Sequence, residues 1–200
     1  MVSVPSTMLP LGTTIPDFVL TNAVDGKPVT PRDYAGRNAL LVMFICNHCP
    51  YVKHVMDEIG RVAVDYDPRG LATIAINAND VAGYPEDGPD RMRELALEKH
   101  WHFPFVLDET QEIAKAFRAA CTPDFFLFDH KQRLAYRGQL DDSRPSKDTP
   151  VTGKDLRAAI EAVLSGKKPS DEQVPSIGCN IKWRAGNQPE YFAPAKRSSP

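Results

Sequence analysis

The chain has 200 residues, of which 42% are hydrophobic and 25% charged, as is typical of a soluble globular protein with a substantial core. Its formal net charge is -2 at pH 7, and acidic and basic residues are mixed along the sequence. This balance gives no electrostatic reason to expect a nucleic-acid or an anionic-membrane partner.

The N-terminal stretch MVSVPSTMLPLGTTIPDF contains neither a basic segment nor a continuous apolar run, so no signal peptide is predicted. The longest apolar run, ALLVMFIC, is too short to cross a bilayer. We therefore expect a cytoplasmic protein, in a compartment where static disulfides are rare. Four cysteines in that setting indicate redox or metal chemistry rather than structural cross-links.

The first predicted elements surround a buried strand. Residues 1–15, rich in Pro and Thr, are expected to form a loose lead-in. The segments DFVL and GKPVT predict a short hairpin with Asp25-Gly26 at its turn. The run ALLVMFI at residues 39–45 is apolar throughout and has the length of a strand, which is typical of a strand covered on both faces.

Helices and strands then alternate. From Val52 onward, apolar residues recur every three or four positions, which predicts an amphipathic helix with Pro50 in its first turn. Asp108 and Gln111 resemble a capping box at the start of a helix over residues 108–120. The other predicted elements are strands at 71–76, 104–107, 125–128 and 133–138, and helices at 91–100 and 155–164.

Strands that alternate with helices imply parallel pairing and a three-layer α/β/α sandwich, to which the closing strand pair adds an antiparallel edge. We expect one domain over residues 1–168. Residues 169–200 show no clear period and are expected to form a C-terminal tail that packs on this domain, with Cys179 and Trp183 as anchors.

Two cysteines, Cys46 and Cys49, fall where the buried strand ends and the helix begins. Functional sites of open α/β sheets gather at the carboxyl ends of strands. The free N–H groups and positive dipole end of a helix N-terminus stabilise a thiolate, the form that attacks a disulfide. We predict a redox dithiol in which Cys46 is the more exposed nucleophile and Cys49 the resolving thiol. A cationic His48 between them would lower the thiol pKa further.

Five stretches of the sequence resemble peroxiredoxin-like, redoxin-type members of the thioredoxin-fold superfamily, and together they span most of residues 39–183. They are CNHCPYV, INANDVAGYPEDGPDRM, FPFVLDETQEIAKAFRAACTPDFFLFD, YRGQLDDSRP and PSIGCNIKW. The resemblance implies a thioredoxin-like fold with an N-terminal hairpin and a C-terminal extension. It also implies a thiol–disulfide oxidoreductase that works through a mixed disulfide, without an organic cofactor or metal.

The same resemblance implies partners of a definite chemical kind. The substrates would be protein or small-molecule disulfides or thiols, reduced or oxidised with the help of an electron donor that the sequence does not identify. A homodimer is an expected assembly, because peroxiredoxin-like folds often pair through sheet edges.

The resemblance further implies a cis peptide bond between Thr122 and Pro123, packed against the cysteine pair. The backbone of Thr122 would then be free to pair with an extended substrate next to Cys46. Cys121 precedes this bond and is either a third redox thiol or a packed side chain. Cys179 could exchange with the pair, cap it, or simply pack.

The sequence differs from thioredoxins in one acidic residue near the cysteine pair. Thioredoxins carry a buried acid on the strand before the cysteine pair, and NALLVMFI contains none. His48 is then the nearest candidate for a proton acceptor. The acid pairs Glu86-Asp87 and Asp141-Asp142 lie in polar loop stretches, where charges are usually solvated, so no catalytic role is expected of them.

Three other functions compete with the oxidoreductase. A thiol peroxidase would use Cys49, with Cys46 as resolving thiol, but the Pro and Thr of the peroxiredoxin signature are replaced by Val42 and Cys46. A thiol-rich metal site would draw its ligands from a larger set, but no second CxxC or HxxxH completes it. That set is Cys46, Cys49, His48, His54, and Cys121 or Cys179. A partner-binding domain without catalysis would use the tail as its interaction element.

Overall fold

The computed structural model of the chain describes residues 3–192. Strand β4 (Ala39–Phe44) is an interior strand of the main sheet and is buried along its whole length. Its alternate side chains enter two separate cores: Leu41 and Met43 point to one face, and Leu40 and Val42 to the other. An unbroken apolar run is what such a doubly covered strand requires.

The main sheet has seven strands in the order β3-β2-β6-β5-β4-β8-β9. Strands β4, β5 and β6 are parallel, and the remaining pairs are antiparallel. The other strands are β2 (Leu20–Asn22), β3 (Pro28–Val29), β5 (Leu71–Asn77), β6 (Phe105–Leu107), β8 (Asp124–Asp129) and β9 (Leu134–Gly138). The predicted parallel centre and antiparallel edge are both confirmed.

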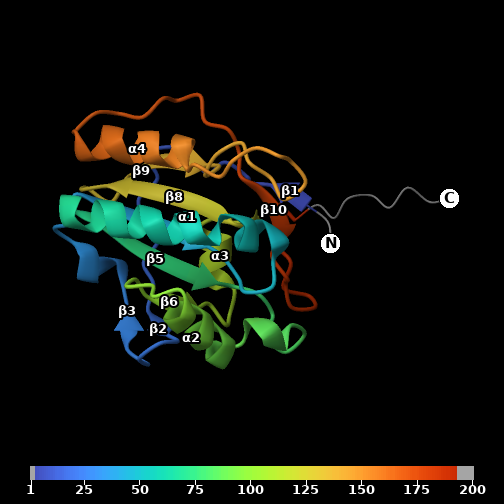
Figure 1. The fold of residues 1–200 in the computed structure, drawn as a ribbon. Coiled ribbons are helices and arrows are strands. Elements are labelled where there is room, and N and C mark those ends of the chain that lie inside the picture. Colours follow the sequence, from blue (N-terminus) through green and yellow to red (C-terminus); the bar gives the residue numbers. More distant parts are fainter. Residues whose placement is uncertain (1–2, 193–200) are drawn as a thin grey trace.

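Helices and loops cover both faces of this sheet (Figure 1). The apolar sides of α1 (Pro50–Tyr66), α2 (Pro89–Glu98) and α4 (Lys154–Leu164) pack in one core. The short helix α3 (Glu112–Ala116) packs in the other. The predicted three-layer sandwich is therefore confirmed. Short 3-10 turns are η1 (Pro31–Tyr34), η2 (Asp67–Arg69) and η3 (Pro85–Asp87). Across residues 3–192, no helix is long and apolar enough to cross a membrane.

The predicted helix over residues 108–120 is much shorter in the structure. Gln111 has a left-handed φ of 65°, so α3 begins only after it and ends at Ala116. The expected capping box does not form, because Asp108 Oδ2 instead accepts the Ala114 N–H at 2.8 Å. The side-chain amide of Gln111 donates to the carbonyls of Ala78 and Lys182. Tertiary hydrogen bonds thus replace the local cap.

A second, three-stranded sheet was not predicted. Its order is β1 (Ser3–Pro5), β10 (Ile177–Asn180) and β7 (Cys121–Thr122), all antiparallel. The expected loose lead-in therefore contains a strand, and so does the tail. Figure 1 shows β1 and β10 together at one end of the main sheet.

The tail continues past β10 along the main body. Trp183 is 9% exposed, and its ring contacts Tyr191 edge-on at 6.4 Å between centroids. Both side chains pack on the core on the α3 side. Residues 193–200 of the predicted tail lie outside the described residues.

Candidate active site

Cys46 and Cys49 lie at the carboxyl end of β4. Cys46 comes two residues after Phe44, the end of the strand, and Cys49 is the N-cap of α1. Pro50 occupies the first helical position, where its missing N–H costs nothing and its fixed φ suits the helix. The predicted location of the pair, between a buried strand and a helix N-terminus, is confirmed.

Both sulfur atoms converge on Thr122. Cys49 Sγ lies 3.1 Å from the Thr122 carbonyl oxygen, and Cys46 Sγ lies 3.5 Å from Thr122 Oγ1. The two thiols are also hydrogen-bonded to each other. The Thr122–Pro123 peptide bond is cis, as the family resemblance implied. The fold thus brings Cys46, Cys49 and the cis-proline turn into one small cluster.

The backbone of Thr122 is not free, contrary to expectation. Strand β10 pairs with it, and Cys179 stands opposite Thr122 in the antiparallel register. A methyl group added at Gly178 would overlap the Thr122 carbonyl, so β10 lies in close contact with this edge. The position expected for a substrate strand is therefore filled by the chain's own tail.

Asp87 is an acid of the site, although its loop sequence indicated a solvated residue. It is completely buried, and its Oδ2 lies 2.6 Å from His48 Nδ1. The carboxylate also accepts the backbone N–H groups of Asn47 and His48 and the side-chain amide of Asn79. The Asn77 amide in turn donates to the Asp87 carbonyl. A buried acid thus lies beside the cysteine motif, on the loop that contains η3 rather than on β4.

His48 is held on two sides. Its ring stacks on Tyr84 with 5.3 Å between centroids and 9° between planes, while Asp87 fixes Nδ1. A hydrogen bond to one ring nitrogen sets which tautomer the neutral ring adopts and leaves Nε2 as the acceptor. Cys46 Sγ, a His48 ring nitrogen and an Asp87 oxygen all lie within 4.8 Å of one another.

The surroundings of the two thiols shift their pKa values in opposite directions. Hydrogen bonds from the Cys179 and Cys46 thiols lower the pKa of Cys49 strongly, and the Val52 N–H in the first turn of α1 adds to this. The hydrogen bond to Cys49, burial and the Asp87 charge raise the pKa of Cys46. The Thr122 carbonyl favours a protonated Cys49, but it is one acceptor against several donors.

The exposure of the two sulfurs does not separate the roles predicted for the pair. Cys46 is 1% exposed and Cys49 is 0% exposed, so Cys46 is not a distinctly open nucleophile. The electrostatic environment instead favours Cys49 as the thiolate of the reduced protein. The sequence pointed to a reactive Cys49 only in the peroxidase alternative, because two of the groups that set the two pKa values lie on β10 and on the loop around η3.

Cys121 and Cys179 have different environments. Cys121 is fully buried, its thiol donates to the Pro123 carbonyl at 3.5 Å, and burial raises its pKa. It packs beside the cis-proline turn. Cys179 is 2% exposed and is hydrogen-bonded to Cys49. Of the two accessory cysteines, only Cys179 is hydrogen-bonded to a member of the pair.

Two of the ligands considered for a metal site, Cys46 and His48, lie close together in the structure. Cys46, His48 and Asp87 form the one cluster of three metal-ligating side chains across residues 3–192. Thiolate, imidazole and carboxylate are ligand types that zinc accepts. The Asp87 carboxylate, however, already accepts four hydrogen bonds, which occupy about four lone-pair sites. This arrangement favours a hydrogen bond between Asp87 and His48 over a metal ion bound between them.

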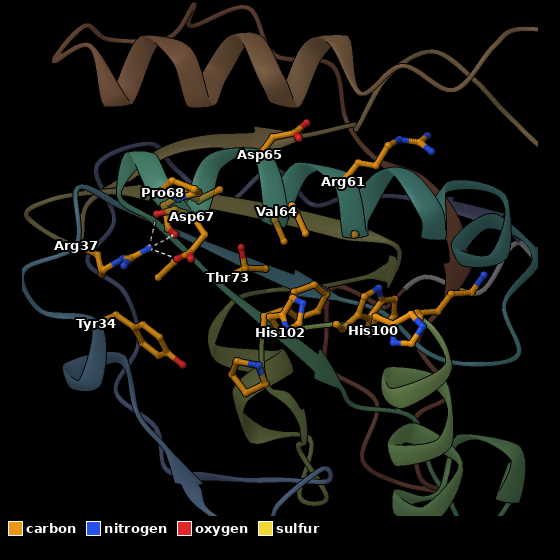
Figure 2. A pocket seen from close by; sticks show the side chains of 18 of the residues that line it. Tyr34, Arg37, Arg61, Val64, Asp65, Asp67, Pro68, Thr73, His100 and His102 are labelled. Carbon is orange, nitrogen blue, oxygen red and sulfur yellow. Dashed lines mark hydrogen bonds and ion pairs between the residues drawn. The ribbon is translucent and has the colours of Figure 1, made fainter.

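A groove of about 910 Å³ lies away from the cysteines. Figure 2 shows side chains of α1, including Arg61 and Val64, on one side of it and His100 and His102 on another. Arg37 is paired with Asp67 on its wall. Among the residues that line it there is no cysteine and no residue of the predicted site. This groove is therefore separate from the predicted site around Cys46 and Cys49.

Comparison with known proteins gives a consistent classification. The crystal structure of an uncharacterized conserved protein from Geobacillus kaustophilus superposes on this chain with a TM-score of 0.90. The two sequences are 53% identical, and the match covers 92% of this chain and 97% of that one. A thioredoxin-family thiol:disulfide interchange protein from Chlorobium tepidum TLS shares the fold at 18% identity and a TM-score of 0.60, covering 76% of this chain and 97% of its own.

Sequence comparison adds a curated relative and a family. The thiol-disulfide oxidoreductase ResA of Geobacillus thermodenitrificans is 26% identical over 131 residues, which are 64% of this chain and 68% of the relative. The sequence model of the Redoxin family matches residues 10–156, well over half of the chain. The chain belongs to the Redoxin family.

Proposed function

We propose that this redoxin is a thiol–disulfide oxidoreductase that cycles Cys46 and Cys49 between a dithiol and a disulfide. The observation that carries the proposal is the hydrogen-bonded pair of thiols at the N-terminus of α1, beside the His48–Asp87 pair. The similarity to the oxidoreductase ResA supports the same reaction class. The substrates are disulfides or thiols, and the electron donor is a second thiol system.

The reaction begins with Cys49. Its thiolate attacks one sulfur of a substrate disulfide, the substrate S–S bond breaks, and the second substrate sulfur leaves with the electron pair. Cys46 then attacks Cys49 Sγ in the mixed disulfide, the Cys46–Cys49 bond forms, and the first substrate sulfur leaves. The dithiol gives up two electrons as the Cys46–Cys49 disulfide forms, and these electrons have reduced the substrate disulfide to two thiols.

His48 and Asp87 serve the second step. Cys46 has a raised pKa and must lose its proton before it can attack. A ring nitrogen of His48 lies within 4.8 Å of Cys46 Sγ, a separation that one bridging water can span to carry that proton to the ring. Asp87, bonded to Nδ1, orients the ring and stabilises the imidazolium that results.

A redox titration tests the proposal. The protein is equilibrated with glutathione buffers of graded potential, alkylated, and digested for mass mapping. We expect one two-electron couple that assigns to Cys46 and Cys49. The Cys46→Ser variant should still react through Cys49, and the Cys49→Ser variant should react far more slowly. A protein in which Cys46 and Cys49 never pair would contradict the proposal.

A thiol peroxidase is the second candidate, favoured by the low pKa of Cys49. Its thiolate would attack hydrogen peroxide, releasing water and leaving a sulfenic acid that Cys46 converts to the same disulfide. Peroxide consumption coupled to a thiol reductant distinguishes the two activities. Fast turnover of peroxide and slow turnover of disulfide substrates would favour the peroxidase.

A further inference from the structure

Strand β10 brings Cys179, from the C-terminal extension, directly to the cysteine pair. In the β10–β7 register Cys179 stands opposite Thr122, the residue whose carbonyl lies 3.1 Å from Cys49 Sγ. Cys46, Cys49 and Cys179 are all buried in the same core cluster. Cys49 is thus the central sulfur of three, hydrogen-bonded to Cys46 on one side and to Cys179 on the other.

The Cys179 sulfur faces the same helix terminus as Cys49. The backbone N–H of Tyr51, in the first turn of α1, is hydrogen-bonded to it, and the charge of Lys182 also favours its thiolate. The hydrogen bond with Cys49 and burial outweigh these effects in the reduced protein and raise the pKa of Cys179. Reduced Cys179 is therefore a protonated donor to Cys49.

Oxidation of Cys49 removes the largest of the effects that hold the proton on Cys179. A sulfur in a disulfide carries no negative charge and no longer holds the Cys179 proton by a charge-assisted hydrogen bond. The Tyr51 N–H and Lys182, which lower the pKa of Cys179, remain in place, and burial is the effect that still raises it. Cys179 then gains thiolate character next to an oxidised sulfur, which is the condition for thiol–disulfide exchange.

We propose that Cys179 is a third redox cysteine that exchanges with Cys49, an inference that rests on the proposed dithiol chemistry. Its sulfur attacks Cys49 Sγ of the Cys46–Cys49 disulfide. The Cys49–Cys179 bond forms, the Cys46–Cys49 bond breaks, and Cys46 leaves with the electron pair. The proton lost by Cys179 ends on Cys46, next to His48. One disulfide replaces another, so no external oxidant or reductant is needed.

The exchange has two structural consequences. Cys46 becomes a free thiol while the protein stays oxidised. The new bond also ties β10, which fills the edge beside Thr122, to the start of α1. Cys121 does not take part, because its thiol is directed to the Pro123 and Ser176 carbonyls rather than to Cys49.

Disulfide mapping of the full chain tests the inference. The wild-type protein and single variants are oxidised with glutathione disulfide, alkylated, and analysed by mass spectrometry. In Cys46→Ser, Cys49 and Cys179 should be joined in most molecules. In Cys46→Ser/Cys179→Ser, the same oxidation should leave glutathione on Cys49. The matched control, Cys46→Ser/Cys121→Ser, should give the Cys49–Cys179 bond as readily as Cys46→Ser.

The outcomes separate this inference from the proposed function. If Cys46→Ser accumulates only the glutathione adduct on Cys49, the third-thiol inference is wrong while the dithiol reaction stands. If wild-type protein forms no disulfide between Cys46 and Cys49, the proposed function itself fails. An oxidised wild-type sample in which some molecules carry the Cys46–Cys49 bond and others the Cys49–Cys179 bond would support both.

Discussion

Asp87 Oδ2 lies 2.6 Å from His48 Nδ1, and this contact joins the cysteine motif to a loop that follows β5. Asp87 is completely buried and accepts four hydrogen bonds from Asn47, His48 and Asn79. A buried carboxylate is tolerated only when its oxygens are satisfied in this way. The loop around η3 is therefore part of the active site.

Replacing Asp87 should change both stability and the reactivity of Cys46. In Asp87→Asn the negative charge is lost, so the pKa of Cys46 should fall. Its new amide would face donors that the carboxylate accepted, at an expected cost of about 1–3 kcal/mol in unfolding free energy. Alkylation of Cys46 as a function of pH, with chemical unfolding alongside, measures both. Glu86→Gln, in the exposed neighbour, is the control, and an unchanged alkylation profile in Asp87→Asn would contradict the assignment.

The thiolate of the reduced protein should belong to Cys49. Its pKa is lowered by donors that include Cys46 and Cys179, so Cys46→Ser or Cys179→Ser should raise it without restoring the ordinary value. Cys49→Ser should remove the thiolate that is present at acidic pH. Ultraviolet thiolate absorbance followed against pH checks this. Loss of the acidic titration in Cys46→Ser rather than in Cys49→Ser would reverse the two roles.

Asp124 should make the protein less stable as the pH rises. It is fully buried, its Oδ1 has no hydrogen-bond partner among the described residues, and burial raises its pKa from 3.8 to about 7. The folded state thus holds this proton more tightly than the unfolded state. The resulting stabilisation is complete below about pH 4 and is lost as the pH rises through 7, by roughly 4 kcal/mol.

The Asp124→Asn variant tests this linkage. It carries no titrating group at this position, so its unfolding free energy relative to wild type should rise between pH 5 and pH 8. Urea unfolding at several pH values measures the difference. The exposed Asp148→Asn variant should follow the wild-type pH dependence. Parallel curves for Asp124→Asn and wild type would show that Asp124 is not the group responsible.

Gly178 should be needed to hold β10 against the cis-proline turn. A methyl group there would overlap the Thr122 carbonyl, so Gly178→Ala should push the strand away and expose Cys49. We expect faster alkylation of Cys49 and a lower yield of the Cys49–Cys179 disulfide. The neighbouring Ile177 is 40% exposed, and Ile177→Ala is the matched control on the same strand. Equal alkylation rates in the two variants would contradict this role.

The sequence by itself determined the parts of this protein that depend on local pattern. The run ALLVMF specified a doubly buried strand, the spacing after Pro50 specified α1, and CNHC at their junction specified where the chemistry lies. Each follows from side-chain periodicity and the dipole of a helix end, which act over a few residues.

Only the tertiary structure decided which distant groups meet the cysteine pair. From its sequence context Asp87 is expected to be a solvated loop acid, and Cys179 lies in a tail without any period. In the structure Asp87 is hydrogen-bonded to His48, and Cys179 is hydrogen-bonded to Cys49. Strand β10 forms because its partners are β1 and β7, not because of its own sequence. The pKa order of the two thiols depends on these long-range contacts, since charge and hydrogen bonding act through space rather than along the chain.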